Sequence, residues 1–422
     1  MKKNLSKLLI IFITFLLTSS IIYKSYADDY IENEQTIDVS SEILEANMTN
    51  SSTLEPSSIN SRSCVVFDRN SHMILYGKNE QKQVKMASTT KIMTAIVVIE
   101  NCNLNDRIEV SKKSASTGGS RLGLKTGDKI TVKDLLYCLM LVSGNDAAVA
   151  LAEHVGGDIQ GFANLMNNKA NELGLTNTHY ESPHGLDSDG HYTTAYELAK
   201  LADYALKNET FFKIVGTKNY TVTINGYLKS LSNTNELLGT LNGIYGVKTG
   251  FTNGANRCLV TSCKRGDMDI ICVVLGADTK NYRTKDSIKL IEYAFNNFTY
   301  INANEIAMKY FDEWKENNLK NIEILKSSCE NIELDLETLD NSTVSINKDL
   351  YNNISCDISI NTNLEAPISS GTILGSLNIN LEGTNIATLN ILNKNDISRK
   401  NISYYLNYFF SNYTTILENI LK

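Results

Sequence analysis

The chain has 422 residues, of which 42% are hydrophobic and 21% are charged. This length suggests two or three domains, and so large an apolar fraction excludes a disordered or fibrous protein. The formal net charge of −7, which falls to −11 when the four Lys of residues 1–27 are removed, argues against nucleic acid as a partner.

Residues 1–27 have the order of a secretory signal peptide. A basic start precedes an apolar run over residues 8–17, and residues 25–27 place small side chains three and one positions before a cut at Asp28. The alternative is an uncleaved anchor helix, but residues 18–20 interrupt an apolar core that is short for a span of about 20 residues. We therefore expect an exported, extracytoplasmic protein.

Export gives the eight cysteines a compartment in which disulfides can form. No CxxC pair occurs, which disfavours zinc-ribbon and thioredoxin-like sites. Cys258 and Cys272 lie in apolar runs, where a thiol is most often a core residue. Cys329 and Cys356 lie together in the C-terminal region, and the sequence leaves open whether they pair.

Residues 28–59 are polar and without periodicity, which predicts a linker between membrane and domain. From residue 60 to residue 297 the elements follow the order hairpin, helices, strands and closing helix. This order predicts an α+β domain with helices packed on an antiparallel sheet. A hairpin is expected over 64–67 and 73–76, and strands over 244–247, 258–262 and 270–275. Helices are expected over 89–100, 132–142, 146–156, 162–173, 196–206 and 285–295.

The sequence changes character after residue 303. Short β-prone segments separated by Asn, Asp and Gly predict a small all-β domain over residues 303–393. Residues 398–422 return to helical spacing, with their apolar residues on one broad face. Such an amphipathic helix either lies on a membrane, here the outer face of the cytoplasmic membrane, or packs on its own domain or in an oligomer.

Ser88-Thr89-Thr90-Lys91 is the first motif with chemical content. Residues three apart share a helix face, so the Ser88 hydroxyl is expected beside the Lys91 amine. A serine nucleophile needs a base, and burial or a nearby cation lowers the pKa of a lysine enough for that role. The helix N-terminus also favours a developing oxyanion. The pair alone is a weak signal, because this spacing is common by chance.

Two further motifs strengthen that signal. Ser143-Gly144-Asn145 lies between two expected helices, where the serine can relay a proton and the asparagine can hold a substrate amide. Lys248-Thr249-Gly250 continues an expected strand, whose edge can pair with an extended peptide. In that triplet the lysine supplies charge, Thr249 can bind a carboxylate and Gly250 allows close approach.

Two other patterns are interpreted as structural. A second Lys-Thr-Gly at residues 125–127 leads into a helix cap and is expected to form a turn. His179, His184 and His191 lie in a polar loop with Asp187, but their spacing fits no common zinc pattern. We therefore expect hydrogen bonding within this loop, and neither a metal nor a cofactor.

With these motifs in this order, the chain resembles the serine D-Ala-D-Ala carboxypeptidases, the low-molecular-mass penicillin-binding proteins. The resemblance covers residues 60–297 and is carried by segments 86–95, 143–157, 182–195 and 246–252. It implies a penicillin-recognising serine hydrolase domain, followed by the family's C-terminal β domain and a membrane-anchoring helix. It also implies cleavage of the D-Ala-D-Ala bond of peptidoglycan stem pentapeptides, with β-lactam antibiotics as covalent ligands.

The resemblance also assigns catalytic roles. Ser88 would be the acylated nucleophile, Lys91 its base and Ser143 a proton relay. The backbone N–H groups of Ser88 and Phe251 would form the oxyanion hole.

The substrate contacts follow in the same way. Asn145 would orient the peptide, while Lys248 and Thr249 would bind its terminal carboxylate. Arg283 falls where the family has an arginine near that carboxylate. Asn256 departs from the family pattern, which usually has Gly there, and Asn can adopt some backbone conformations of Gly.

Three alternatives stay open. A transpeptidase of the same fold would use an amine acceptor. A class A β-lactamase shares two of the motifs, but the chain has no ExxLN segment to activate the deacylating water. A wall-binding module without turnover is disfavoured because every catalytic side chain is present.

Overall fold

The computed structural model describes residues 37–50, 56, 58–329 and 332–420, so the expected signal peptide lies outside the described residues. The chain divides into two compact units, Met1–Asn296 and Asn297–Lys422. Each unit is described by itself.

The first unit is built on a five-stranded antiparallel sheet with the order β2-β1-β9-β8-β7. Its strands are β1 (Ser63–Asp68), β2 (Ile74–Lys78), β7 (Ile244–Thr252), β8 (Asn256–Arg265) and β9 (Met268–Ala277). Every residue of the central strand β9 is buried, which fits the apolar run over residues 270–275. The strand β7 is left at one edge.

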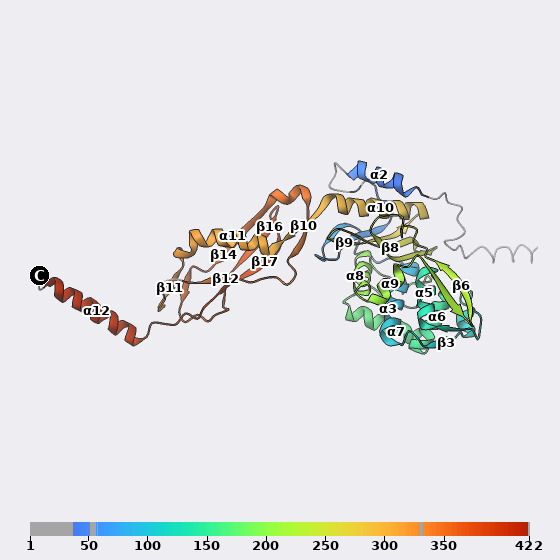
Figure 1. Cartoon of the computed structure of the whole chain (residues 1–422), viewed down its shortest axis with the longest axis horizontal. Coiled ribbons are helices and arrows are strands. Elements are labelled where there is room, and N and C mark those ends of the chain that lie inside the picture. Colours follow the sequence, from blue (N-terminus) through green and yellow to red (C-terminus); the bar gives the residue numbers. More distant parts are fainter. Residues whose placement is uncertain (1–36, 51–55, 57, 330–331, 421–422) are drawn as a thin grey trace, which may run out of the picture. The chain divides into compact units, whose positions relative to one another are not determined.

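Helices lie on both faces of this sheet, which confirms the predicted α+β arrangement (Figure 1). The helix α10 covers one face and α8 packs against β1 and β9 on the other. The helices of this unit are α2 (Val39–Asn50), α3 (Lys91–Asn101), α4 (Lys112–Ala115), α5 (Val132–Leu141), α6 (Asn145–Gly156), α7 (Ile159–Glu172), α8 (Ala195–Leu206), α9 (Glu209–Val215) and α10 (Lys280–Asn297). Because α3 is surrounded by α5, α6, α7 and α8, its first eight residues are buried.

Smaller elements complete the unit. A 3-10 turn, η1 (Ala87–Thr90), leads directly into α3. Two small antiparallel sheets stand apart from the main sheet: β3 (Arg107–Glu109) with β4 (Lys129–Thr131), and the hairpin of β5 (Asn219–Ile224) and β6 (Tyr227–Ser232).

The expectation of a linker without periodic structure over 28–59 is wrong for residues 39–50, which form α2. A long-range ion pair contributes to this helix, because Glu42 lies 2.5 Å from the Lys285 ammonium of α10. A partner nearly 250 residues away leaves no local pattern in the sequence.

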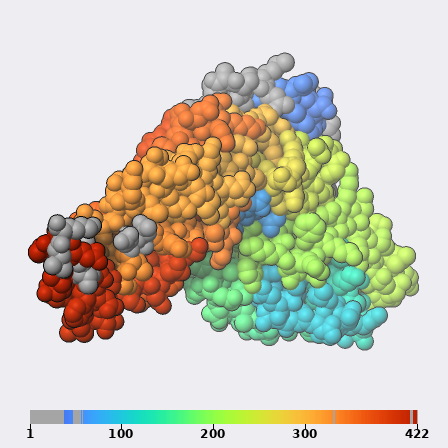
Figure 2. All heavy atoms as spheres, turned by 60° about the vertical axis from the view of Figure 1, so that its left-hand side comes forward, coloured from blue at the N-terminus to red at the C-terminus, as the bar shows by residue number. Residues whose placement is uncertain are grey.

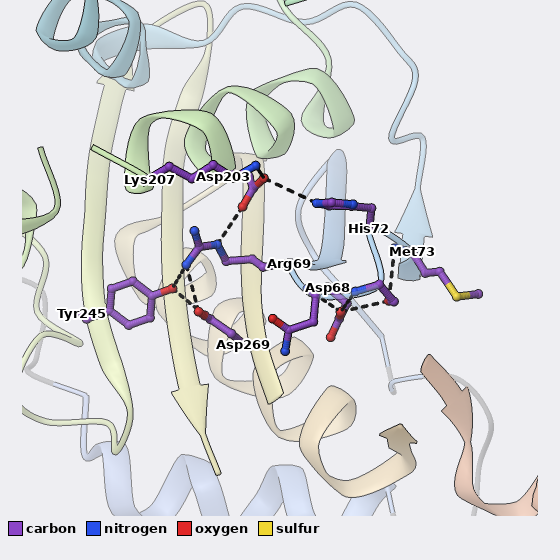
Figure 3. A network of polar contacts seen from close by, with 10 residues as sticks. Asp68, Arg69, His72, Met73, Asp203, Lys207, Tyr245 and Asp269 are labelled. Atoms are coloured by element: carbon purple, nitrogen blue, oxygen red, sulfur yellow. Dashed lines mark hydrogen bonds and ion pairs between the residues drawn. The ribbon is translucent and has the colours of Figure 1, made fainter. Parts of the chain in front are cut away.

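A polar network holds the β1–β2 turn to the rest of the first unit (Figure 3). The Arg69 guanidinium donates to Asp203 of α8 at 2.8 Å, and to Tyr245 of β7 and Asp269 of β9 at the same distance. Asp68 accepts from the backbone N–H groups of residues 70 and 71 and so shapes the turn itself. The Arg69 guanidinium thereby joins the strands β7 and β9 and the helix α8 at one end of the sheet.

The second unit is mostly β-structure, as predicted. Its largest sheet has the order β12-β17-β16-β14, and two smaller pairs are β10 with β13 and β11 with β15. The strands are β10 (Phe298–Asn302), β11 (Glu323–Leu325), β12 (Leu334–Leu336), β13 (Thr343–Asn347), β14 (Ile354–Ile360), β15 (Asn363–Glu365), β16 (Ile373–Leu381) and β17 (Thr384–Asn393). The prediction of an all-β domain over residues 303–393 is wrong at its start, where α11 (Ala303–Asn318) lies between β10 and β11. Two 3-10 turns, η2 (Leu319–Asn321) and η3 (Lys348–Asn353), connect these elements.

The second unit ends in α12 (Ile402–Ile420), where a helix was expected. Its aromatic and aliphatic side chains stand on the surface, in red in Figure 2. Among the described residues, no helix has the length and apolarity that a membrane crossing requires. Cys329 and Cys356 are free thiols.

Candidate active site

Ser88 is presented by a strained turn at the start of α3. The preceding Ala87 has a left-handed backbone with φ +48°, which non-glycine residues rarely adopt. Its carbonyl accepts from the Thr90 hydroxyl at 2.7 Å. Gly185 packs so closely on that carbonyl that a Cβ there would lie 1.9 Å from its oxygen. This packing holds the turn so that Ser88 is half-buried between buried neighbours.

Lys91 follows on the same face, as the spacing predicted, and is fully buried. Its Nζ lies 2.8 Å from Ser88 Oγ, 2.7 Å from Asn145 Oδ1 and 3.0 Å from the His184 carbonyl oxygen. The last two atoms only accept hydrogen bonds, because the Asn145 Nδ2 donates to the Gly118 carbonyl at 2.8 Å and this fixes its amide orientation. Nζ thus faces three oxygens, as an ammonium does. After the loss of one proton it keeps two N–H groups for Asn145 and His184 and presents its lone pair to the Ser88 hydroxyl. The contacts therefore suit a lysine acting as general base.

The Ser143-Gly144-Asn145 turn joins α5 to α6 and lies beside this pair. Ser143 is also left-handed, with φ +59°, and its hydroxyl has no hydrogen-bond partner among the described residues. Backbone strain of this kind is found preferentially at functional sites. The hydroxyl is thus available to a substrate.

A buried carboxylate supports the turn from behind. Asp146, the second residue of α6, accepts from the backbone N–H groups of Leu122, Gly123 and Leu124 at 2.8 to 3.0 Å. Charge-assisted bonds of this type are stronger than neutral ones. They fix the loop of residues 118–124, whose Gly118 carbonyl binds Asn145. Sequence reasoning did not assign a role to this loop.

The motif Lys248-Thr249-Gly250 lies on β7, the edge strand of the sheet, directly against η1. A Cβ on Gly250 would lie 3.1 Å from the Ser88 backbone nitrogen, which explains the absence of a side chain. The Lys248 Nζ donates to the Thr249 carbonyl at 3.0 Å. Thr249 Oγ1 lies 2.7 Å from Thr234 Oγ1. β7 pairs with β8 on one side only, so its other edge can receive an extended peptide.

Phe251 follows on β7, and the centre of its ring lies 3.7 Å from the Arg257 guanidinium carbon. Arg283 is fully buried on α10, and its guanidinium donates to both carboxylate oxygens of Glu236 at 2.7 and 2.9 Å. Burial alone would raise the pKa of Glu236, but the Arg283 charge and the Thr284 hydroxyl hold it below its usual range. Direct contact of Arg283 with a substrate carboxylate stays a prediction.

The loop of residues 182–191 closes another side of the site, a part that motif spacing alone did not assign. It supplies the His184 carbonyl to Lys91 and Gly185 to the nucleophile turn. Asp187 accepts from the Thr252 hydroxyl at 2.7 Å and from the Gly254 N–H at 2.9 Å, which ties this loop to the end of β7. The contacts confirm that the loop is held by hydrogen bonds.

The histidines of this loop are held in the neutral form. Burial, with the Lys91 charge nearby, lowers the pKa of His184 to about 3. Burial likewise lowers the pKa of His191 to about 4. Over residues 37–50, 56, 58–329 and 332–420, no group of three or more His, Cys, Asp or Glu is placed to hold a metal ion.

Two details of the sequence analysis have structural answers. Residues 126 and 127 form a turn, with Gly127 at φ +85°, so the second Lys-Thr-Gly is structural as expected. Asn256 adopts φ +58° at the start of β8. It therefore takes a conformation typical of the glycine that the family usually has there.

Comparison with known proteins agrees with this geometry. The family model for D-alanyl-D-alanine carboxypeptidase matches residues 48–279, and that for the C-terminal domain of penicillin-binding protein 5 matches residues 315–399. The carboxypeptidase DacF of Bacillus subtilis is 33% identical over 352 residues, which are 82% of this chain and 88% of the relative.

Solved structures of related enzymes share the fold. The D-alanyl-D-alanine carboxypeptidase DacD from Francisella tularensis aligns with a TM-score of 0.70 at 28% identity, over 82% of this chain and 96% of its own. The DD-transpeptidase of Streptomyces K15 aligns with a TM-score of 0.55 at 36% identity, over 57% of this chain and 99% of its own.

Proposed function

Since this chain belongs to the D-alanyl-D-alanine carboxypeptidase family, it is a serine-type carboxypeptidase, and we propose that Ser88, Lys91 and Ser143 carry out its chemistry. The expected fold, a penicillin-recognising serine hydrolase domain followed by a β domain, is confirmed by the family and structural matches. The observation that carries the catalytic proposal is the 2.8 Å contact between Lys91 Nζ and Ser88 Oγ beside the edge strand β7.

In the proposed reaction, Ser88 Oγ attacks the carbonyl carbon of the D-Ala-D-Ala bond while its proton passes to Lys91 Nζ. The oxyanion that forms is stabilised by the N–H groups of Ser88 and Phe251. The C–N bond then breaks, and the Ser143 hydroxyl relays a proton to the leaving amine of D-Ala. Water hydrolyses the acyl-Ser88 ester, which releases the shortened stem peptide and returns the proton to Ser88.

Substrate binding is proposed to use the edge of β7 and the Asn145 amide. The peptide would lie extended along β7, with its terminal carboxylate near the Lys248 ammonium and the Thr249 hydroxyl. Asn145 would hold an amide of the peptide while keeping its contact with Lys91. A β-lactam, which carries a similar carboxylate and a reactive carbonyl, would acylate Ser88 in the same position.

Covalent labelling by a fluorescent penicillin tests the nucleophile. We expect one label per full-length chain, on Ser88, and no label on Ser88→Ala. Ser116→Ala, which removes an exposed serine outside the site, is the matched control and should label like the wild type. Labelling that survives Ser88→Ala would refute the assignment.

A transpeptidase activity is a second candidate, because a structural relative is described as a DD-transpeptidase. An amine acceptor added to the assay would then give a new peptide at the expense of hydrolysis. A β-lactamase activity would instead show as rapid loss of the penicillin label.

We also propose that the protein is exported and bound peripherally to the outer face of the cytoplasmic membrane. The basic and apolar order of residues 1–27 supports export. The exposed apolar side chains of α12 support contact with the lipid surface. A mature N-terminus at Asp28, read by mass spectrometry of the secreted protein, would support cleavage, and an intact residue 1 would refute it.

A further inference from the structure

Thr234 lies between two parts of the proposed site. Its backbone N–H donates to the Leu141 carbonyl at 3.1 Å, at the end of α5 and two residues before Ser143. Its hydroxyl oxygen lies 2.7 Å from the Thr249 hydroxyl oxygen on β7. The residue is half-buried and therefore not part of the core. No sequence motif pointed to it.

The flanking residues fix Thr234 in this position. Asn235 is buried and its Nδ2 donates to the Gly246 carbonyl of β7 at 3.0 Å. On the other side, the Asn233 Nδ2 donates to the Thr217 carbonyl at 3.1 Å. The side-chain hydrogen bonds of Asn233 and Asn235 therefore hold the backbone on both sides of Thr234. They keep its hydroxyl within hydrogen-bond distance of Thr249.

The number of protons on the two hydroxyls determines which of them should donate to the other when a peptide is bound. Each hydroxyl has one proton, and two hydroxyls in contact share a single hydrogen bond. If Thr249 donated to Thr234, it would turn lone pairs toward the carboxylate of a bound peptide. If Thr234 donates to Thr249, the Thr249 proton is available for the carboxylate. A donor chain in this order is also strengthened by polarisation.

The surrounding charges make this orientation important. The fully buried Arg283 forms an ion pair with Glu236, which lies two residues after Thr234. Because the two charges offset each other, the pair supplies little net attraction for an anion. Recognition of a terminal carboxylate then depends on the Lys248 ammonium and on a Thr249 hydroxyl whose proton points toward the carboxylate.

We propose that Thr234 is a positioning residue for recognition of the substrate carboxylate. Its hydroxyl donates to Thr249 Oγ1 and turns the Thr249 proton toward the terminal carboxylate. It thereby favours peptides that end in a free carboxylate over peptides that end in an amide. This inference rests on the proposed function, in which Thr249 binds that carboxylate.

The test compares Thr234→Val and Thr234→Ser in the full chain. Valine keeps the shape and loses the hydroxyl, whereas serine keeps the hydroxyl. The substrates are a synthetic peptide ending in D-Ala-D-Ala and the same peptide with a C-terminal amide. For the free acid, we expect Thr234→Val to lower kcat/KM about tenfold, the effect of one hydrogen bond to a charged assembly, mainly through KM. Thr234→Ser should stay within about twofold of wild type, and the amide peptide should be cleaved equally by all three.

The results that would overturn this inference differ from the result that would overturn the proposed function. Equal kcat/KM of Thr234→Val and wild type on the free acid overturns the inference, as does an equal loss on both peptides, which a merely structural role would give. Thermal melting checks the fold, and Thr234→Ala replaces Thr234→Val if the latter does not fold. Failure of the wild type to release either D-Ala from the free acid or D-alaninamide from the amide would instead overturn the proposed function and this inference with it.

Discussion

At the scale of single residues, the site is marked by backbone conformations that side chains disfavour. Ala87 and Ser143 both have positive φ, and both adjoin atoms that the mechanism uses. Such strain persists only where the surroundings enforce it. Here the enforcement comes from the Thr90 hydroxyl and Gly185 at the first position and from Asp146 behind the second.

The buried His191 supports the nucleophile turn indirectly, through a chain of hydrogen bonds. The Glu181 N–H donates to its Nδ1 at 3.0 Å, so the neutral ring carries its proton on Nε2, 2.7 Å from Thr90 Oγ1. The Thr90 hydroxyl in turn donates to the Ala87 carbonyl. Protonation of the ring would place an N–H against the Glu181 N–H and break this chain.

This arrangement predicts acid sensitivity. Burial lowers the pKa of His191 from 6.5 to about 4 despite the nearby Glu181 and Asp187, with His179 adding to the decrease. Between these values the unfolded chain binds the proton and the folded chain does not, so stability is full above pH 6.5 and falls as the pH falls toward 4. The expected loss is about 3 kcal/mol of unfolding free energy at His191 alone.

Urea unfolding at pH 7 and pH 4 measures this loss. His191→Gln offers a matched control, because its amide can donate and accept but does not titrate. Wild type should lose about 3 kcal/mol more than the variant between the two pH values. Parallel losses in the two proteins would refute the role given to His191.

At the scale of elements, the sequence predicted the helices and strands that have a strong apolar periodicity. It did not predict elements whose periodicity is weak or whose stability depends on contacts with distant residues. The strands β7, β8 and β9 and the helices α3, α5, α6 and α8 were predicted from apolar patterns. The helices α2, α9 and α11 were not. The hairpin of β5 and β6 had a readable signal, since Asn225 and Gly226 form its turn with φ +51° and +87°, which Asn-Gly favours.

The helix α12 gives an element-scale prediction for the membrane proposal. Its exposed Phe409 and Phe410 form part of an apolar surface with little charge, so we expect binding to uncharged phosphatidylcholine vesicles as well as to anionic ones. Replacing both residues by Ser in the full chain should lower vesicle binding about tenfold or more, as judged by co-sedimentation. The corresponding change at Tyr227 and Leu228, exposed in the β5–β6 hairpin, should have no effect. Equal binding by all three proteins would exclude α12 as the contact.

At the scale of the whole molecule, the site is assembled from segments that lie far apart in sequence. Motif order identified the nucleophile turn, the Ser143 turn and the edge strand β7 from the sequence. The supporting contacts could not be predicted, because loops 118–124 and 182–191 and Thr234 reach the site only through tertiary packing. The same holds for Arg283, whose burial against Glu236 has no sequence signature.

The central claim is that this chain releases D-Ala through Ser88. The most direct test is to measure free D-Ala liberated from a synthetic peptide ending in D-Ala-D-Ala by the full chain and by Ser88→Ala. We predict release by the wild type and a loss of at least about a thousandfold in the variant, as expected when a catalytic nucleophile is removed. Release that continues at the wild-type rate in Ser88→Ala would contradict the account.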